Sequence, residues 1–332
     1  MKMSSSKKKL NFYRRIILTK PKIIILMYHR INNLKNINGF FSDVLSTSPA
    51  NFERQIKFIS KNFRVILLRD IPDIVKNKKI KNNYLAITFD DGYKDNYDHA
   101  FYIMEKHKVK GTFFICPEYI SSNKIYWWDE ISYIINNNEY EAAADFISNQ
   151  LDMKLKKTIP QKLISSVVQK VKYFPIKKRR YFISSLKKRF SYKNINNNQL
   201  LRWENIIEME RSGMEIGAHT NNHSILSTLN YQDQYKEINK SKEILKKKIK
   251  KKIKSFSYPN GKKKDFNEKT INILKDLNFK CAATTIVGKN DFSTSMFNLK
   301  RIPVSYTTNG IKLRMDLKGY LDFPRKIKES IW

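Results

Sequence analysis

The sequence contains little cysteine, and this shortage argues against two kinds of stabilised fold. Only Cys116 and Cys281 occur among 332 residues, and no CxxC pair is present. Two cysteines do not make a disulfide framework, and the missing CxxC pair argues against a zinc knuckle. Both cysteines lie in apolar runs, so we expect reduced thiols in the core, as is usual in a cytosolic protein.

Long apolar runs are missing as well. No run is long enough to cross a bilayer. The N-terminal residues are basic, but the stretch Ile23–Tyr28 is too short for the hydrophobic part of a signal peptide, and no small-residue cleavage site follows. We therefore expect a soluble, cytoplasmic protein whose basic extension, residues 1–21, is disordered. Peripheral contact of this extension with an anionic membrane surface is left open.

Acidic residues are scarce relative to basic ones. The chain has 65 Lys and Arg against 30 Asp and Glu, which gives a net charge of +35. Such a charge is typical of proteins that bind nucleic acid, anionic lipid or an acidic polymer. Here the basic residues are spread over the whole chain, and Lys, Asn and Ile, which share A/T-rich codons, are abundant together. We interpret the charge as mainly compositional and expect no specific nucleic-acid partner.

Short apolar runs alternate with helical patterns along the chain. The runs are continuously hydrophobic, as in parallel strands that are covered on both faces, and the repeated βα units indicate a parallel α/β fold, either a barrel or an open sheet. Residues 121–200 look helical and strand-free, so we expect an insertion there, within a domain of residues 22–310 that is followed by a tail over 311–332. The predicted strands are Ile23–Tyr28, Arg64–Leu68, Leu85–Phe89, Thr112–Cys116, Glu215–Ala218, Ile253–Tyr258, Cys281–Thr285 and Arg301–Val304.

Polar residues follow three of these strands directly. His29 comes after the first strand, Asp90 and Asp91 come after the third, and His219 follows the strand that ends at Ala218. In parallel barrels the carboxyl ends of the strands converge, and the active site lies at that face. The pattern therefore predicts a site built from these side chains.

Two of these positions belong to clusters with the spacing of a metal site. Asp90 and Asp91 point to opposite faces in a regular strand, so both reach one site only if the strand stops and Gly92 turns the backbone. His219 and His223 are four residues apart, which places both imidazoles on one side of a helical turn. With Asp91 they form one carboxylate and two imidazoles, a set that leaves positions open for water and substrate.

Several segments together resemble one family. The TFDDG segment at Thr88–Gly92 and the HTNNH segment at His219–His223 are similar to the first two motifs of the polysaccharide deacetylase, or NodB-homology, family (carbohydrate esterase family four). The resemblance runs from about residue 22 to 305 and is greatest to the branch with poly-N-acetylglucosamine deacetylases. Further segments that carry it are Met27–Arg30, Gly111–Phe114, Trp127–Asp129, Glu215–Ala218, Tyr258–Gly261 and Arg301–Pro303.

The resemblance implies a fold, a cofactor and a set of roles. It implies a deformed (β/α)7 barrel and a divalent metal ion, often Zn²⁺. It assigns Asp90 as the general base and Asp91, His219 and His223 as the metal ligands. Much of the family has a late catalytic histidine, which this chain lacks, whereas the poly-N-acetylglucosamine branch has an early Tyr-His motif that matches His29. The resemblance therefore makes His29 the catalytic acid.

The third family motif departs from the usual pattern. Many members carry an arginine before this motif that steadies the base, whereas this chain has Ser257-Tyr258-Pro259-Asn260. Arg301 is a candidate to replace that arginine. By analogy, the backbone of Tyr258–Asn260 also provides an oxyanion donor.

The implied function is metal-dependent removal of N-acetyl groups from the amino sugars of a glycan. Two alternatives stay open at this point. The same motifs suit a deacylase for an ester or a small amide, because the acyl chemistry is shared. A protein that binds polyanions or nucleic acid without catalysis is the alternative that the net charge of +35 suggests.

Overall fold

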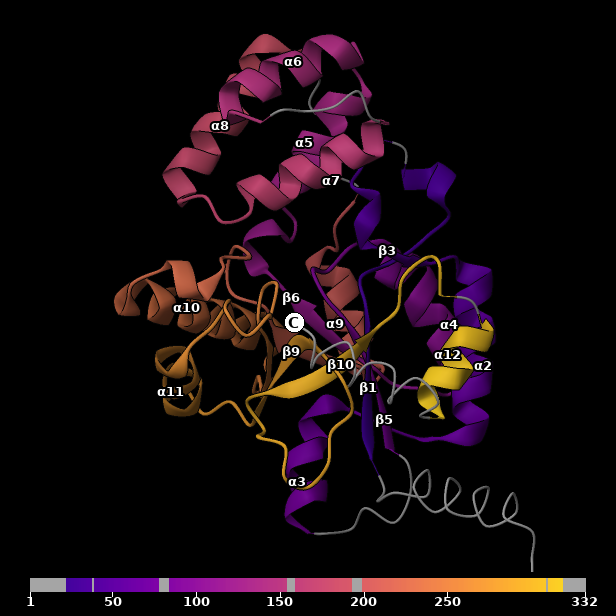
Figure 1. Cartoon of the computed structure of the whole chain (residues 1–332). Helices are drawn as coiled ribbons and strands as arrows, with labels where there is room; N and C mark the ends of the chain where they lie inside the picture. The colour runs from indigo at the N-terminus through magenta and orange to yellow at the C-terminus, as the bar shows by residue number, and fades with distance from the viewer. Residues whose placement is uncertain are drawn as a thin grey trace, which may run out of the picture.

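A ring of parallel strands lies at the centre of the molecule (Figure 1). The ring consists of β1 (Ile23–Tyr28), β5 (Tyr84–Phe89), β6 (Thr112–Ile115), β7 (Glu215–Ala218), β8 (Ser255–Ser257), β9 (Cys281–Val287) and β10 (Leu299–Pro303). It closes because β1 pairs with β10 on one side and with β5 on the other. The predicted (β/α)7 barrel is confirmed. The computed structural model describes residues 22–37, 39–77, 84–153, 159–192, 199–308 and 310–318.

The ring is deformed around β5. The first half of β5 pairs with the short strand β4 (Arg64–Ile66). The second half of β5 pairs with β6, where Thr88 lies opposite Thr112. A separate small sheet joins β2 (Arg30–Ile31) to β3 (Leu45–Thr47). The predicted extension over residues 1–21 and most of the predicted C-terminal tail lie outside the described residues.

The strands form where the sequence is apolar on both faces. Every residue of β1 and of β5 is buried, because side chains that point inward fill the barrel and those that point outward pack against helices. On the outer side of the barrel, the rings of Phe89 and Phe113 stack with centroids 4.5 Å apart, and the ring of Phe52 packs edge-on against Phe89. Cys116 and Cys281 are buried free thiols, as predicted.

Helices surround the ring (Figure 1). At the start of the first helix, Ser48 Oγ accepts a hydrogen bond from the amide of Asn51, and Pro49 occupies the first turn. Within the described residues, no helix has the length and apolar character needed to cross a membrane. The surrounding helices are α2 (Pro49–Asn62), α3 (Ile71–Lys76), α4 (Tyr102–Lys106), α9 (Trp203–Arg211), α10 (Tyr231–Ile249), α11 (Glu268–Asp276) and α12 (Gly310–Leu317).

The helical segment that follows Asp95 is not uniform. Its first part, η4 (Asn96–Phe101), is a π-helix, and α4 follows it. Polar contacts fix this wider turn, because Asp95 accepts hydrogen bonds from Arg30 Nε at 2.8 Å and from the amide of Ile31, while Asn96 Nδ2 donates to the carbonyl of His29. Such π-turns are frequent near functional sites. Here the turn anchors the chain beside His29.

Residues 121–200, which the sequence predicts to be free of strands, contain helices that are stacked above one end of the barrel (Figure 1). They pack through a hydrophobic cluster that is separate from the barrel core. Tyr93 belongs to this cluster and pairs with Leu200 through a β-bridge, so the segment is tied to the turn after β5. The helices are α5 (Trp127–Asn136), α6 (Tyr140–Leu151), α7 (Pro160–Val171) and α8 (Ile176–Arg189).

The stack of Phe89 and Phe113 generates a prediction about stability. Phe113 is fully buried, so Phe113→Ala should lower the free energy of unfolding by about 3–5 kcal/mol, measured by urea denaturation. Phe292→Ala is the matched control, because that ring is 41% exposed, and we expect a change within about 0.5 kcal/mol. A loss below about 1 kcal/mol for Phe113→Ala would show that the interior refills the space.

Candidate active site

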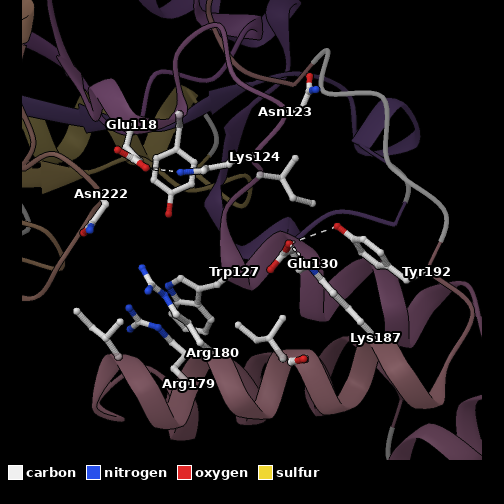
Figure 2. A pocket seen from close by; sticks show the side chains of 15 residues that line it. Glu118, Asn123, Lys124, Trp127, Glu130, Arg179, Arg180, Lys187, Tyr192 and Asn222 are labelled. Atoms are coloured by element: carbon white, nitrogen blue, oxygen red, sulfur yellow. Dashed lines mark hydrogen bonds and ion pairs between the residues drawn. The ribbon is translucent and has the colours of Figure 1, made fainter.

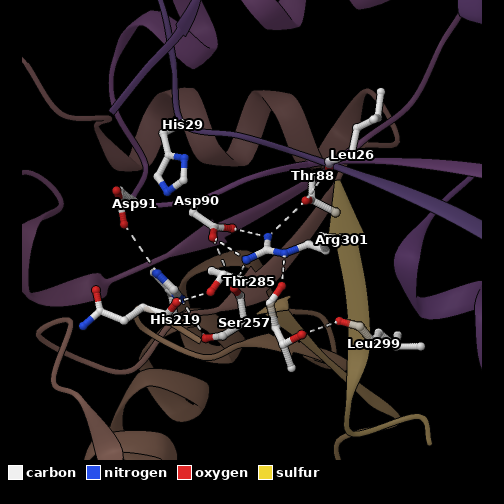
Figure 3. Close-up of polar contacts among 12 residues, drawn as sticks. Leu26, His29, Thr88, Asp90, Asp91, His219, Ser257, Thr285, Leu299 and Arg301 are labelled. Carbon is white, nitrogen blue, oxygen red and sulfur yellow. Dashed lines mark hydrogen bonds and ion pairs between the residues drawn. The ribbon is translucent and has the colours of Figure 1, made fainter. Parts of the chain in front are cut away.

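All the residues singled out at strand ends meet at one cavity. His29, Asp90, Asp91, His219 and His223 line a cavity of about 250 Å³. Their side chains come from segments far apart in the sequence, namely the ends of β1, β5 and β7 and the loop after β7. Figure 3 shows His29, Asp90, Asp91 and His219 directed toward the same space. Convergence at the carboxyl ends of the strands is where a parallel barrel places an active site.

The turn after β5 separates the two adjacent carboxylates. β5 ends at Phe89, and after Asp90 the backbone turns left-handed, with φ of 75° at Asp91 and 72° at Gly92. A residue with a side chain rarely adopts this conformation, and at Gly92 an added Cβ would also lie 3.1 Å from Ile115 Cδ1. The strand therefore stops as the sequence predicts, and both carboxylates face the same cavity.

Asp90 forms a bidentate ion pair with Arg301 from β10. Arg301 Nη1 lies 2.8 Å from Asp90 Oδ1, and Arg301 Nη2 lies 2.7 Å from Oδ2. Burial by itself would raise the pKa of Asp90, but the Arg301 guanidinium holds this pKa well below its usual range. Arg301 is itself fully buried and also donates to the carbonyl of Thr284 at 2.7 Å and to Ser257 Oγ at 3.0 Å. The arginine absent from the third motif is thus supplied by a different strand.

Asp91 faces two imidazoles. Its Oδ1 lies 3.4 Å from His219 Nε2 and 3.4 Å from His223 Nε2. On the other side of the first ring, His219 Nδ1 lies 2.7 Å from the carbonyl oxygen of Ser257 at the end of β8. A ring that donates from Nδ1 leaves the Nε2 lone pair directed at Asp91. Burial lowers the pKa of His223 to about 3, so its ring is neutral at neutral pH.

The HTNNH segment is a turn and not the helical turn that its spacing suggested. Thr220 and His223 both have a φ of 59°, which no helix contains. Two backbone amides, those of Asn221 and Asn222, donate to Glu237 Oε2 of α10 at 3.2 Å each. The prediction that both imidazoles face one point holds, but the reason is a loop held by Glu237, which the spacing did not reveal.

The chemistry of this triad fits a divalent cation. Asp91 Oδ1 is buried and has no hydrogen-bond partner among the described residues, a costly arrangement unless a cation offsets it. The donor atoms of Asp91, His219 and His223 lie within 4.8 Å of one another. Ligand atoms about 2.1 Å from one tetrahedral ion are about 3.4 Å apart, which matches the observed spacing to each imidazole. Asp90 is less suited as a ligand, because Arg301 engages both of its oxygens.

His29 lies on the opposite side of the cavity from the strand that carries His219 (Figure 3). Its backbone is held at both ends, since its amide donates to Ser46 Oγ at 2.8 Å and its carbonyl accepts from Asn96 Nδ2 at 2.6 Å. These contacts leave the imidazole directed into the cavity beside Asp90 and Asp91. Neither His99 nor His107 lines the cavity, and His107 Nε2 lies 3.2 Å from Glu53 Oε1.

The turn after β8 provides a backbone donor. Tyr258 uses its amide in a hydrogen bond to the carbonyl of Ala283, and Pro259 has no amide hydrogen. Asn260 lines the cavity, and its amide has no acceptor within the described part of the chain. The left-handed turn at Asn260, with a φ of 61°, is closed by the Gly261 carbonyl accepting from the Thr285 amide at 2.9 Å. Of the three residues considered for an oxyanion donor, Asn260 is the one with a free amide.

Some residues of the cavity wall carried no signal in the sequence. Lys172 and Arg179 of the inserted helices line the cavity, and Tyr126 donates to the carbonyl of Asp91 at 2.6 Å. Trp128 is buried, and its ring lies 4.8 Å from that of His223. Isolated basic or aromatic residues in a Lys-rich helical segment look like surface and core residues, so only the fold reveals their position.

Sequence comparison identifies relatives of this chain. The family model for polysaccharide deacetylase matches residues 77–282. The chain is 22% identical over 291 residues to YxkH of Bacillus subtilis, a homologue named for polysaccharide deacetylases, and this alignment covers 87% of this chain and 74% of the relative. It is 30% identical over 118 residues to the poly-β-1,6-N-acetyl-D-glucosamine N-deacetylase of Staphylococcus aureus, with 33% of this chain and 41% of that enzyme covered.

Structure comparison supports the same fold. The Streptococcus pyogenes deacetylase PplD aligns with a TM-score of 0.61 and 19% identity over 90% of this chain and 99% of that chain. IcaB from Ammonifex degensii aligns with a TM-score of 0.57 and 17% identity over 90% of this chain and 98% of that chain. At these identities the likeness concerns the fold.

The Asp90–Arg301 pair generates a prediction about stability. Arg301→Met leaves a buried carboxylate without its partner, so we expect the free energy of unfolding at pH 7 to fall by about 3–5 kcal/mol in urea denaturation. Asp90→Asn combined with Arg301→Met removes both charges and should lose less than Arg301→Met alone.

Arg211→Met is the matched control for this cycle. Arg211 is exposed on α9, and its replacement should change stability by no more than about 0.5 kcal/mol. If the double variant were as unstable as Arg301→Met or worse, the cost would come from lost packing of the arginine and not from the unpaired carboxylate.

Proposed function

This chain belongs to the polysaccharide deacetylase family and is a deacetylase, and on that premise we propose that it hydrolyses the N-acetyl groups of amino sugars in a glycan with the help of a divalent metal ion. The observation that carries the proposal is a buried oxygen of Asp91 that has no hydrogen-bond partner among the described residues and faces two imidazoles. Next to it, Arg301 holds the second carboxylate, Asp90. We also propose that residues 22–310 act as one catalytic domain, with residues 121–200 as its insertion.

The metal ligands in this proposal are Asp91, His219 and His223. One carboxylate and two neutral imidazoles suit Zn²⁺ and leave coordination positions open. When bound, such an ion would polarise an acyl oxygen and lower the pKa of a water molecule toward about 7. The hydrogen bond of His219 to Ser257 orients one of the ligands before any ion is present.

Asp90 is the proposed general base. The hydrolytic water gives a proton to the Asp90 carboxylate as its oxygen attacks the acetyl carbon. Arg301 keeps this carboxylate ionised. Because it donates one hydrogen bond to each carboxylate oxygen, it also fixes the orientation of the carboxylate, which a single hydrogen bond would leave free to rotate. Ser257 Oγ adds a longer hydrogen bond of 3.3 Å to Oδ2.

His29 is the proposed general acid, and Asn260 is the proposed oxyanion donor. An amine is a poor leaving group unless it gains a proton, and His29 is directed into the cavity beside the base. Its imidazolium gives a proton to the sugar nitrogen as the carbon–nitrogen bond breaks, which leaves acetate and a free amine. The amide of Asn260 donates to the oxygen that becomes negative when water attacks.

The first test measures metal-dependent acetate release. Incubation with N-acetylated glycans, including a poly-β-1,6-N-acetylglucosamine oligomer, should release acetate, and a chelator should abolish the release until Zn²⁺ is restored. His219→Ala and His223→Ala should each weaken binding of the ion, measured by metal analysis of the purified protein, because each removes a ligand.

Asp90→Asn is the control for this test. It removes proton acceptance and should lower turnover by about 10²–10⁴-fold while the ion stays bound, because Asp90 is not among the proposed ligands. Full metal content in the His219→Ala, His223→Ala double variant would contradict the ligand set. If the protein hydrolyses esters but no acetamide, an esterase on the same scaffold would be favoured. If it binds nucleic acid and shows no turnover, the polyanion-binding alternative would be favoured.

The second test separates a proton donor from a residue that shapes the site. His29→Ala should retain the metal but lower the rate of acetamide hydrolysis by about 10²-fold or more. An activated aryl ester, whose leaving group needs no proton, should lose much less. The measurement is kcat/KM on both substrates with the same enzyme preparation.

His107→Ala is the matched control, because His107 pairs with Glu53 away from the cavity. Its kcat/KM should match that of the wild type on both substrates. Equal losses on the acetamide and the ester for His29→Ala would mean that His29 binds or shapes and does not donate a proton.

A further inference from the structure

A second cavity adjoins the candidate active site. It has a volume of about 650 Å³ and lies between α5, α8 and the turn η5 (Pro117–Tyr119). Trp127 and Arg179 line both this cavity and the smaller one that contains the catalytic residues. Asn222, from the loop that carries His219 and His223, lines the outer cavity too. The two cavities therefore meet beside the proposed metal ligands.

The acidic residues of the outer cavity are already neutralised. Glu118 pairs with Lys124 and lies 3.8 Å from Lys240. Glu130 pairs with Lys187 and accepts a hydrogen bond from Tyr192 at 3.3 Å (Figure 2). These carboxylates have no charge left to balance further cations.

Three cations around the junction are not balanced in this way. Among the described residues, none of Lys172, Arg179 and Arg180 forms an ion pair. The carboxylate that acts most on Lys172 is Asp265, which already accepts hydrogen bonds from the Lys262 amide and from Tyr173. The positive charges therefore remain available to a ligand.

Arg179 and Lys172 are held in place at the junction. The Arg179 guanidinium lies 5.0 Å from the centroid of the Trp127 ring, and its Nη1 donates weakly, at 3.4 Å, to the carbonyl of Lys172. Both side chains are half-buried, and burial lowers the pKa of each. Figure 2 shows Arg179 and Arg180 rising from α8 into the space beside Trp127. Partly desolvated cations attract an anion more strongly than fully hydrated ones do.

We propose that Lys172, Arg179 and Arg180 form a subsite for an anionic substituent, a phosphate or a carboxylate, on a sugar that neighbours the one to be deacetylated. This inference rests on the proposed function, because it takes the acetamide to lie beside Asp90 and Asp91. A glycan held there leaves the inner cavity past Trp127 and Arg179, where the two cavities join. The guanidinium of Arg179 suits the paired oxygens of a carboxylate or phosphate.

A glycan fits this position better than a polynucleotide does. The outer cavity has the size of pockets that hold small ligands, about 300–1,000 Å³, and it opens into the reaction centre. Non-specific binding of nucleic acid instead needs a series of phosphate contacts along a surface. The substrate of this enzyme is therefore an amino-sugar polymer that carries negative charge.

The experiment compares matched neutral and anionic ligands on the full-length, metal-loaded protein. The turnover probes are an N-acetylglucosamine tetramer and the same tetramer carrying a 6-phosphate or an adjoining uronate. We expect kcat/KM to be about tenfold or more higher on the anionic tetramers, the range of one charge-assisted hydrogen bond. Arg179→Gln and Lys172→Gln should each reduce this ratio toward one, and Arg179→Lys should restore part of it.

Lys177→Gln is the matched control, because Lys177 is exposed on the same helix and does not line either cavity. It should leave the ratio unchanged. A wild-type ratio near one would overturn the proposal, and so would a ratio that Arg179→Gln leaves intact or that Lys177→Gln reduces equally. A thymidine octamer that competes as well as the anionic tetramers would also overturn it, by showing that the net charge acts non-specifically. Thermal melting checks that every variant is folded.

A binding measurement separates this proposal from the proposed reaction. A glucose tetramer carries no acetamide, so calorimetric titration with its 6-phosphate form and its neutral form reports binding without turnover. The phosphate form should bind about tenfold tighter, and Arg179→Gln should remove the difference. Equal binding of both forms overturns the subsite even if acetate release succeeds. If no acetamide is hydrolysed but the Arg179-dependent preference is seen, the subsite is supported and the deacetylation proposal fails.

Discussion

The buried ion pair between Arg301 and Asp90 is the interaction on which the arrangement of the site depends. It joins β10 to the end of β5 across the barrel, and the same guanidinium also contacts Thr284 of β9 and Ser257 at the end of β8. Two buried charges are tolerated because each satisfies the other with two short hydrogen bonds. One arginine therefore fixes the positions of several strand ends and keeps Asp90 ionised in a place where burial by itself would raise its pKa.

This pair also distinguishes two carboxylates that are neighbours in sequence. Arg301 engages Asp90, whereas Asp91 is left with a buried oxygen that faces His219 and His223. The left-handed turn at Asp91 allows both to face one cavity. Two identical side chains thus acquire different chemistry from their surroundings, one suited to accept a proton and the other suited to bind a cation.

The inserted helices extend the site beyond the barrel. Their separate hydrophobic cluster lets them stand above the strand ends while Tyr126 contacts the backbone of Asp91. They contribute Lys172 and Arg179 to the wall of the cavity at the strand ends. A barrel supplies catalytic groups from its strand ends, and loops and insertions vary the ligand that reaches them. In this chain the insertion adds positive charge to a site that otherwise contains carboxylates and imidazoles.

The sequence by itself indicated the seven strands of the barrel and the polar residues that follow them, but not the short strands β2 and β3. Continuous apolar runs predict strands buried on both faces, and a polar residue directly after such a run, as with His29 or His219, lies at the strand end whatever the rest of the chain does. The tertiary structure decided which distant groups meet there. Arg301 and Asp90 are 211 positions apart, and Glu237 reaches the HTNNH turn only because α10 packs behind it. Local patterns record burial and turns, whereas contacts between distant segments exist only after the barrel has closed.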